Sequence, residues 1–468
     1  MTTEMPQPPA LATVSPAARE LKAMCGDIVT VPGDADYDTL RTPWNVAAQQ
    51  HPAAVAVPTS AEEVALVVRA AAAAGLRVAP QGTGHGACSL SRRDLSAVVL
   101  LRTTALTGVS VDPVTGIARV GAGTLAEDLV VAAGEHGLAC LHGSSPDVGV
   151  AGLTLGGGIG WYGRAHGLAC NRMTAVELVT ADGELVRADA ENDADLFWAV
   201  RGGSGNFGVV TALEVALLPI ADAYAGMMAW DIAHFEKVLR HYNAWAPGAP
   251  DEVSSSLRAM RFPPLPFIPE EVRGRSLVMF DGAVLADDPR AEEILAGFRA
   301  LEPEVDTFHR VEAPSLIRLH GDPEGPTPAA GSGTLVDQLD EQTLQAYVAA
   351  VGPEADTHLL MAELRQLGGA LRRPAEHGGA LRALEADFAA YFVGIAPTPE
   401  LAGMVDADAV RALESLAGAA PGRNYLNLVE HVVDPATGFD ADSWARLQQL
   451  RADVDPTGLF LANHSFGG

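Results

Sequence analysis

The chain has 468 residues, of which 48% are hydrophobic, and its 59 acidic and 31 basic side chains give a net charge of −28. This length exceeds a single ordinary hydrophobic core, so we expect two lobes. The negative charge argues against nucleic acid and anionic membranes as partners, because both would repel it. The sequence shows no bilayer-spanning apolar run, no secretory signal and no metal-ligand spacing among its four cysteines. We therefore expect a cytoplasmic protein with reduced thiols and no metal site.

Strand-like and helix-like segments alternate through the first half of the chain. A helix is expected around Ser15–Met24, and Ser60 is a suitable N-cap for another that ends near Gly75. Further helices are expected at 124–135 and 194–200. This alternation is typical of an α/β-type lobe that reaches to about residue 219. Strands are expected at Ala53–Val57, Arg77–Ala79, Ala97–Leu101, Ile117–Gly121, Ala175–Thr180, Leu185–Ala188 and Val209–Leu217.

Two glycine-rich turns lie about sixty residues apart within this lobe. The first, at 79–87, reads APQGTGHGA, and the second, at 149–161, reads GVAGLTLGGGIGW. Glycine lets backbone N–H groups approach a ligand closely and can thereby cradle a pyrophosphate. Two such turns, one with His85 between glycines, predict a site for a large dinucleotide.

The pattern changes after Pro219, where the strand-like segments become longer and alternate in character. Helices are expected at 235–245, 289–301, 340–351, 406–418 and 443–452, and a Gly/Pro-rich loop at 321–333. We therefore predict a mainly antiparallel sheet with helices over one face. Its strands are expected at Ala223–Asp231, Val253–Met260, Leu277–Val284, Leu359–Leu367 and Asp387–Ile395.

A G-x-G-x-x-G pattern at 203–208 does not indicate a Rossmann nucleotide site. That site needs a strand before the glycines and a helix after them. Here a helix-like segment precedes them and the strand-like Val209–Thr211 follows, so we reject that interpretation.

The sequence resembles the berberine-bridge-enzyme-like flavin oxidases, which belong to the vanillyl-alcohol oxidase and para-cresol methylhydroxylase (PCMH) superfamily. The resemblance is carried by the two glycine turns, the run Leu196–Val210, the segment Glu363–Ala370 and the tail. The resemblance implies an α+β, two-lobed fold, in which a PCMH-type FAD-binding lobe faces a substrate lobe made of an antiparallel sheet covered by helices. It divides the chain into an N-terminal segment (1–45), the FAD-binding domain (46–219), the substrate-binding domain (220–420) and a C-terminal segment that returns to the first lobe (421–468).

The resemblance implies FAD as cofactor, bound covalently through His85. The alternative is a histidine that only caps the loop or stacks on the ring. Gln81 stands where the family usually has arginine, and Ser145 stands where many members attach FAD a second time through cysteine. A hydroxyl is a poor nucleophile without a base, so we expect attachment through His85 only. His142 either contacts the flavin ring or simply packs. The expected cofactor-binding residues are Gln81, Gly82, Thr83, Gly84, His85, Gly86, Ser89, His142, Gly143, Ser144, Val148, Gly149, Gly152, Gly156, Gly157, Gly160, Gly205, Gly208, Val209, Val210, Tyr425, Asn427 and Asn463.

The substrate lobe should supply the group that removes a proton from the substrate. The tail tyrosine that some family members use is absent, because Leu428 stands there. Glu363 is our first candidate, on the expectation that partial burial raises its pKa, and its alternative role is that of a salt-bridged strand acid. Strand alternation places Gln366 on the opposite face from Glu363, so Gln366 or Tyr391 could act instead.

The expected reaction is the two-electron oxidation of a CH–OH, CH–NH or activated C–H bond in a small molecule. The small residue Val150, at a position that the resemblance connects with oxygen access, favours molecular oxygen as acceptor, giving hydrogen peroxide. The composition and the resemblance suggest a tailoring step on a natural product. Two alternatives remain open: a dehydrogenase with another electron acceptor, and a non-catalytic protein that binds flavin or a metabolite.

Overall fold

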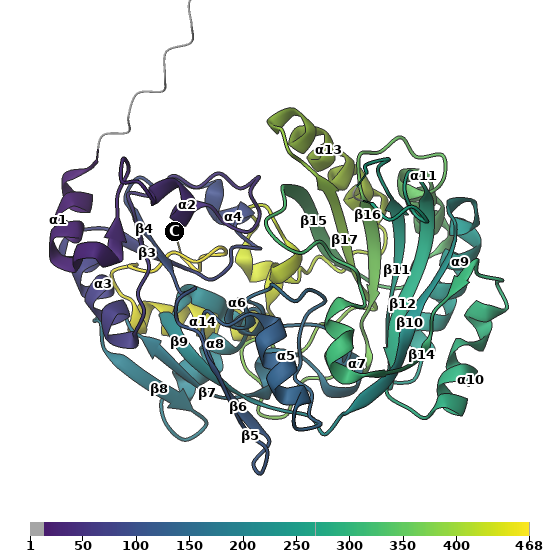
Figure 1. Ribbon diagram of the computed structural model, residues 1–468, viewed down its shortest axis with the longest axis horizontal. Coiled ribbons are helices and arrows are strands. Elements are labelled where there is room, and N and C mark those ends of the chain that lie inside the picture. Colours follow the sequence, from purple (N-terminus) through teal and green to yellow (C-terminus); the bar gives the residue numbers. More distant parts are fainter. Residues whose placement is uncertain (1–13, 267, 468) are drawn as a thin grey trace, which may run out of the picture.

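The computed structural model describes residues 14–266 and 268–467 and consists of two lobes that lie side by side (Figure 1). The first lobe contains two sheets and the second contains one large sheet. The chain passes from the first lobe to the second between strands β9 (Val209–Ala216) and β10 (Asp222–Asp231). None of the helices in these residues is both long enough and apolar enough to cross a membrane.

The first lobe is built on a four-stranded and a five-stranded sheet. The smaller sheet, in the order β1-β2-β4-β3, pairs β2, β4 and β3 in parallel. The larger, in the order β5-β6-β9-β7-β8, is antiparallel throughout. Besides β9, these strands are β1 (Val29–Thr30), β2 (Ala54–Ala56), β3 (Arg77–Gln81), β4 (Val98–Arg102), β5 (Val109–Asp112), β6 (Ile117–Gly121), β7 (Met173–Val179) and β8 (Leu185–Asp189).

Helix α3 (Ala61–Ala73) shows how the sequence builds this lobe. The Ser60 hydroxyl caps it by accepting the Glu63 N–H at 3.3 Å, and the Glu63 carboxylate accepts the Thr59 N–H at 2.6 Å. Val64, Val67, Val68 and Ala71 form its buried stripe against the four-stranded sheet. The other helices of the lobe are α1 (Pro16–Cys25), α2 (Tyr37–Arg41), α4 (Cys88–Ser91), α5 (Ala126–Gly134), α6 (Val150–Leu155), α7 (Gly163–His166) and α8 (Ala194–Gly203).

The second lobe is an antiparallel sheet with helices over one face. Its order is β13-β10-β12-β11-β16-β17-β15, and β14 also pairs with β10. The strands after β10 are β11 (Val253–Arg261), β12 (Ser276–Val284), β13 (Val305–Asp306), β14 (His309–Glu312), β15 (Ala329–Val336), β16 (Met361–Gln366) and β17 (Phe388–Ile395). The helices of the lobe are α9 (Phe235–Trp245), α10 (Asp288–Arg299), α11 (Glu341–Val351), α12 (Gly369–Arg372) and α13 (Pro399–Ser415).

Helices α9, α10, α11 and α13 bury their apolar stripes on one face of this sheet. Leu257, Phe280, Leu364 and Phe392 meet them there. Because side chains alternate along a strand, the neighbouring residues point to the other face. That second face carries Glu363 and Tyr391, opposite one another in register.

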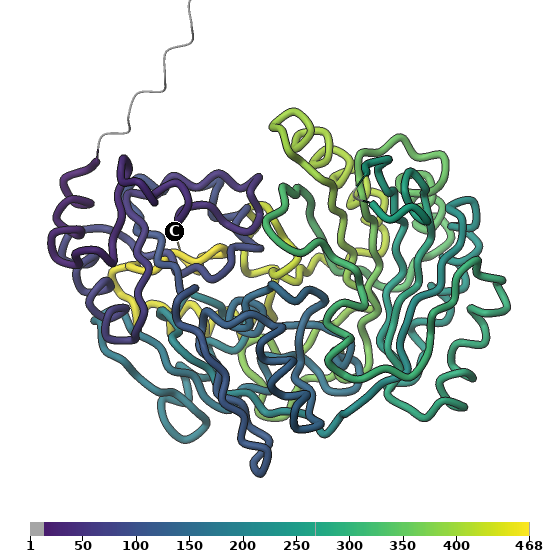
Figure 2. The backbone as a smooth tube through the Cα atoms, viewed as in Figure 1, coloured from purple at the N-terminus to yellow at the C-terminus, as the bar shows by residue number. Residues whose placement is uncertain are grey.

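The chain end returns to the first lobe, as the yellow segment in Figure 2 shows. Helix α14 (Ala441–Val454) packs against α8, and Phe460 pairs with Val78 of β3 in parallel. The expected two-lobed α+β fold is therefore confirmed.

Two expectations about elements were wrong. Strand β15 begins inside the predicted loop at 321–333 and includes its residues 329–333, although its Ala-Ala-Gly-Ser-Gly start lacks β-branched residues. A Cβ on Gly331 would lie 2.1 Å from the Phe392 carbonyl oxygen, so the small residues allow a close approach of two backbones. Helix α13 begins at Pro399 rather than near 406, because the Thr398 hydroxyl caps it by accepting the Leu401 N–H.

Candidate active site

The first glycine turn joins β3 directly to α4 and presents His85. The Trp44 indole stacks on the His85 ring with centroids 4.0 Å apart and planes 17° apart. The Thr83 hydroxyl lies 2.8 Å from Nδ1, and an Asp147 oxygen lies 3.4 Å from Nε2. The Asp147 contact is an ion-pair distance without hydrogen-bond alignment. The ring is about one quarter exposed, so it is fixed in place but open on one side.

Asp147 lies two residues before the second turn and connects several segments. It accepts hydrogen bonds from the Trp44 indole at 2.6 Å, the Gly325 N–H at 2.8 Å and the Ser145 hydroxyl at 2.8 Å. Ser145, which stands at the family's cysteine position, is thus occupied with Asp147.

The glycines differ in what makes them necessary. A Cβ at Gly160 would lie 1.8 Å from the His142 carbonyl oxygen, and one at Gly156 would lie 2.0 Å from the Asn427 side chain. Gly84 has a φ of +89°, and its Cβ would collide with Pro43. These glycines let protein segments pack against one another. Gly152, in contrast, has nothing within 4 Å of its Cβ position and leaves room for a ligand.

Several buried polar atoms around the two turns lack a partner, which is the pattern that a polar cofactor would complete. Both amide atoms of Gln81, Nε2 of His142 and Nε1 of Trp161 are buried and have no hydrogen bond. Burial lowers the pKa of His142 to about 4, so its ring is neutral at pH 7. Its Nδ1 donates to the Gly143 carbonyl at 2.6 Å, which leaves Nε2 as a free acceptor. Because such atoms are costly to bury alone, these residues fit FAD.

The tail residues expected at the cofactor contact the glycine turns. The Tyr425 hydroxyl accepts the Gly158 N–H at 2.8 Å, and the Asn427 amide donates to the Leu153 carbonyl at 3.0 Å. The Asn463 amide donates to the Gly86 carbonyl at 2.8 Å, and the Ser89 hydroxyl donates to the His431 carbonyl at 3.1 Å.

The G-x-G-x-x-G segment also contacts the tail, and it leads from α8 into β9 as expected. The Asn206 side chain donates to the His464 carbonyl and accepts the Phe466 N–H, both at 3.0 Å. Gly208 packs against Leu178, and Val209 and Val210 then open β9. Of the remaining expected residues, Gly143 is placed so that a Cβ on it would lie 3.5 Å from the Leu153 side chain, and the Val148 carbonyl accepts the Ala126 N–H.

A buried ionic cluster covers part of the free face of the second-lobe sheet. The Arg365 guanidinium donates to Glu363 at 2.7 Å, and the Ser256 hydroxyl donates to the same oxygen at 2.6 Å. Nδ1 of His320 lies 2.6 Å from Asp281.

The expectation that Glu363 has a raised pKa was wrong. Burial alone would raise it, but the charges of Arg365 and His320 and the hydrogen bonds from Arg365 and Ser256 outweigh burial and lower the pKa to about 2. Glu363 is therefore ionised and paired at neutral pH, which makes it a weak proton acceptor.

Tyr391 lies beside Glu363 in the sheet, and its hydroxyl donates to Glu430 of the tail. The second carboxylate oxygen of Glu430 is buried without a partner. Burial raises the pKa of Glu430 above its ordinary value of 4.5, although the hydrogen bond from Tyr391 acts in the opposite direction. The pKa of Tyr391 is raised well above 10 by burial and by the Glu430 charge.

Gln366 points to the helix-covered side. Its amide oxygen accepts from the Ser255 hydroxyl, and its amide nitrogen donates to the Ala246 carbonyl, both at 2.8 Å. Both polar ends are therefore occupied within the lobe.

The two lobes meet where the second turn reaches this sheet. The Ser144 hydroxyl donates to Asp322 at 2.8 Å, and the Trp161 ring lies 5.9 Å from the His320 ring. A cavity of about 10 Å³ lies between them, lined by Ser144, Ile159, Gly160, Trp161, Ser254, Ser255, Arg365, Gln366, Leu367 and Leu371. The second glycine turn and the sheet of the second lobe thus meet in one region.

Sequence reasoning missed Trp44, Asp147, Asp281, His320 and Glu430. Trp44 and Asp147 are 103 residues apart, and no local pattern joins them. Glu430 and His431 did carry a signal, since they are two adjacent polar residues inside the apolar run Leu428–Val433.

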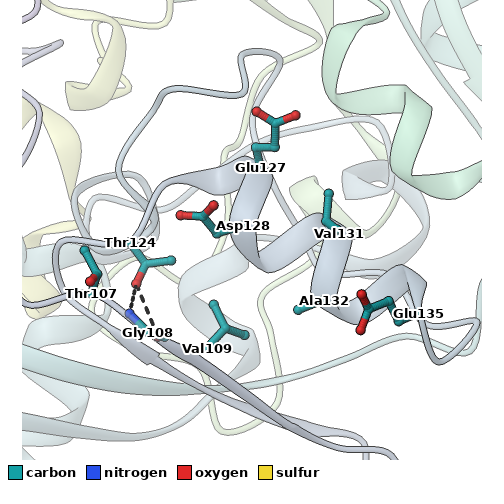
Figure 3. Close-up of a pocket in the computed structure, with 9 residues that line it drawn as sticks. All are labelled: Thr107, Gly108, Val109, Thr124, Glu127, Asp128, Val131, Ala132 and Glu135. Carbon is teal, nitrogen blue, oxygen red and sulfur yellow. Dashed lines mark hydrogen bonds between the residues drawn. The ribbon is translucent and has the colours of Figure 1, made fainter.

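A separate surface depression of about 490 Å³ lies along α5 (Figure 3). Glu127, Asp128 and Glu135 line it, and Glu127 is ion-paired with Arg318. It contains no residue of either glycine turn, so we do not assign the chemistry to it.

Comparison with known proteins agrees with this geometry. Residues 52–189 match the family model of the FAD binding domain. (R)-6-hydroxynicotine oxidase of Paenarthrobacter nicotinovorans is 27% identical over 457 residues, which cover 93% of this chain and 96% of that enzyme. Xylooligosaccharide oxidase of Thermothelomyces thermophilus is 34% identical over 187 residues, which are 40% of this chain and only 38% of that enzyme.

The solved structure of BBE-like 1 from Physcomitrella patens superposes with a TM-score of 0.83, covering 96% of this chain and 99% of that one at 22% identity. That likeness shows the fold, and the FAD binding domain and the oxidase relatives show the chemistry class. The chain is therefore an FAD-linked oxidoreductase with the two-lobed, PCMH-type fold of the berberine-bridge-like oxidases.

Proposed function

We propose that the protein is an oxidase that removes two electrons from a CH–OH, CH–NH or activated C–H bond of a small organic molecule. The electrons pass to molecular oxygen, giving hydrogen peroxide. The relatives named for 6-hydroxynicotine and xylooligosaccharides support an amine or an alcohol as the group oxidised. We further propose that this oxidation is a tailoring step on a natural product.

The two glycine turns would hold the FAD, with His85 as its only covalent attachment. The free amide of Gln81, Nε2 of His142 and the indole N–H of Trp161 are the groups open to it. Ser145 is occupied by Asp147 and the Cys140 thiol is fully buried, which supports a single bond. When bound, FAD supplies the site that accepts the two electrons.

The pair Tyr391 and Glu430 is the observation that carries the proposal. Tyr391 is partly exposed on the substrate face, and its hydroxyl donates to a buried carboxylate that has one free oxygen. As the substrate releases its proton, the Tyr391 oxygen accepts it while the Tyr391 proton moves to Glu430. A carboxylate with a raised pKa is a better acceptor for this proton than the salt-bridged Glu363.

The ionic cluster of Glu363, Arg365, His320 and Asp281 has a different role in this proposal. Its partners fix the Arg365 side chain, which is 16% exposed beside the lobe boundary and can orient the polar part of a substrate. Asp281 and Arg365 in turn hold the His320 ring between them.

The test is anaerobic flavin reduction by 6-hydroxynicotine and by a xylooligosaccharide, followed by peroxide release in air. For an active substrate, Tyr391→Phe and Glu430→Gln should each slow reduction by roughly 10²–10⁴-fold, the usual span for a positioned acid–base group. Glu363→Gln should have a smaller effect. If Glu363→Gln slows flavin reduction and Tyr391→Phe does not, Glu363 is the proton acceptor. Flavin that no candidate substrate reduces would favour the non-catalytic alternative.

A further inference from the structure

The Asp147 carboxylate stands next to the residue that would carry FAD, and three segments of the chain hold it there. Its Oδ2 accepts the Trp44 indole N–H at 2.6 Å and the Gly325 N–H at 2.8 Å. Its Oδ1 accepts the Ser145 hydroxyl at 2.8 Å and lies 3.4 Å from Nε2 of His85. Asp147 therefore has little freedom to move relative to the His85 ring.

These contacts also keep Asp147 ionised. Burial alone would raise its pKa, but the contact with His85 and the hydrogen bonds from Gly325, Trp44 and Ser145 hold the pKa well below its usual range. A negative charge thus remains beside the His85 ring at neutral pH.

The His85 ring is held from three sides. Trp44 covers one face, the Thr83 hydroxyl meets Nδ1 at 2.8 Å, and Asp147 stands at Nε2. Trp44 donates a hydrogen bond to Asp147 and stacks on His85. It therefore aligns both the imidazole ring and the carboxylate beside that ring.

We propose that Asp147 is a positioning residue for the attachment of FAD to His85, an inference that rests on the covalent bond in the proposed function. The bond joins an imidazole nitrogen to a methyl carbon of the flavin ring, and one N–H and one C–H bond break. The two protons and two electrons released are taken up by molecular oxygen as hydrogen peroxide. As the imidazole forms this bond it develops positive charge, which a carboxylate 3.4 Å away stabilises.

The test compares Asp147→Asn with the wild-type holoenzyme. Asparagine keeps the size of the side chain and an oxygen acceptor but removes the charge. The measured quantity is the share of protein-bound flavin that stays with the acid-precipitated protein, together with the rate at which this share grows on incubation with FAD in air. We expect attachment to slow by roughly 10- to 100-fold, the loss typical when the carboxylate partner of a working histidine is removed.

Asp322→Asn is the matched control, because Asp322 accepts a hydrogen bond from Ser144 of the same segment, whereas no hydrogen bond or ion pair joins it to His85 in the described part of the chain. It should leave covalent attachment unchanged. A second comparison separates positioning from a structural role: in the His85→Ala background, Asp147→Asn should leave the dissociation constant for FAD unchanged, because no bond can form there.

Full attachment in Asp147→Asn would overturn the inference and leave the His85 bond intact. If Asp147→Asn weakens FAD binding in the His85→Ala background, the inference is also overturned, because Asp147 would then only shape the FAD site. Wild-type protein that releases all its flavin in acid would contradict the His85 bond itself, and this inference with it.

Discussion

Single residues in this protein act through partners that lie far away in the sequence. His85 and its glycines could be predicted because they form one short segment with a recognisable pattern. Trp44, Asp147 and Gly325, which fix the ring, come from three separate segments, and only the fold brings them together. The pKa of Glu363 was misjudged partly for the same reason, because His320 and Ser256, which add to the effect of the neighbouring Arg365, lie 43 and 107 positions earlier in the chain.

If Glu430 takes the proton as proposed, its raised pKa should give flavin reduction a pH dependence. Tyr391 can pass a proton only to an ionised Glu430, so the rate of flavin reduction should rise as the pH increases through the elevated pKa of this carboxyl and then level off. Anaerobic reduction rates measured across the pH range check this. Glu430→Gln should abolish this limb of the profile, and a limb that persists unchanged in the variant would exclude Glu430.

Glu363 should make the free energy of unfolding depend on pH in the acid range. Its pKa is lowered from 4.5 to about 2, so its stabilisation is fully present above 4.5 and is lost as the pH falls toward 2. At about 1.4 kcal/mol per pKa unit the contribution at pH 7 is at most about 3 kcal/mol.

Glu363→Gln should therefore lower the free energy of unfolding at pH 7 by about 1–3 kcal/mol, with the deficit shrinking below pH 4.5. Urea unfolding over this range measures it. A deficit that does not change with pH would show that packing, not charge, is responsible.

At the scale of elements, the strands and helices with clear periodicity were predictable and the glycine-containing ones were not. Helix α9 buries Phe235, Val238, Leu239 and Tyr242 at helical spacing, and the sequence predicts its bounds. Strand β15 has no such pattern, because its glycines serve close backbone contacts with β17 that depend on tertiary structure. The glycine turns likewise contain a helix, α6, that their composition conceals.

Two glycines of the second turn should respond differently to alanine. Gly160→Ala places a Cβ 1.8 Å from the His142 carbonyl oxygen and should cost the apoprotein about 1–3 kcal/mol. Gly152→Ala meets no atom within 4 Å and removes a helix-interior glycine, so the apoprotein should melt no lower.

If FAD approaches this open position, Gly152→Ala should nevertheless reduce the ratio of bound flavin to protein. Melting of the two apoproteins and flavin absorbance of the two holoproteins are the measurements. Normal flavin content in Gly152→Ala would place the cofactor elsewhere, and an unchanged melting temperature for Gly160→Ala would contradict the packing described here.

At the scale of the whole molecule, the chain returns repeatedly to the same boundary between lobes. The loop after residue 319 reaches the segment that precedes the second glycine turn at two points, through Asp322 to Ser144 and through Gly325 to Asp147. The tail crosses from Glu430 at the substrate sheet to Asn463 at the first turn. The two-lobed architecture was predictable from the change in pattern near residue 219, but this convergence depends on segments hundreds of residues apart.

The measurement that tests the oxidase most directly needs no substrate. The holoenzyme is reduced anaerobically with one equivalent of dithionite per flavin and then mixed with oxygenated buffer, while flavin absorbance and hydrogen peroxide are followed. We predict rapid reoxidation with one mole of peroxide per mole of flavin. Flavin that remains reduced in oxygen yet is reoxidised at once by a quinone or a dye would contradict the account and identify a dehydrogenase.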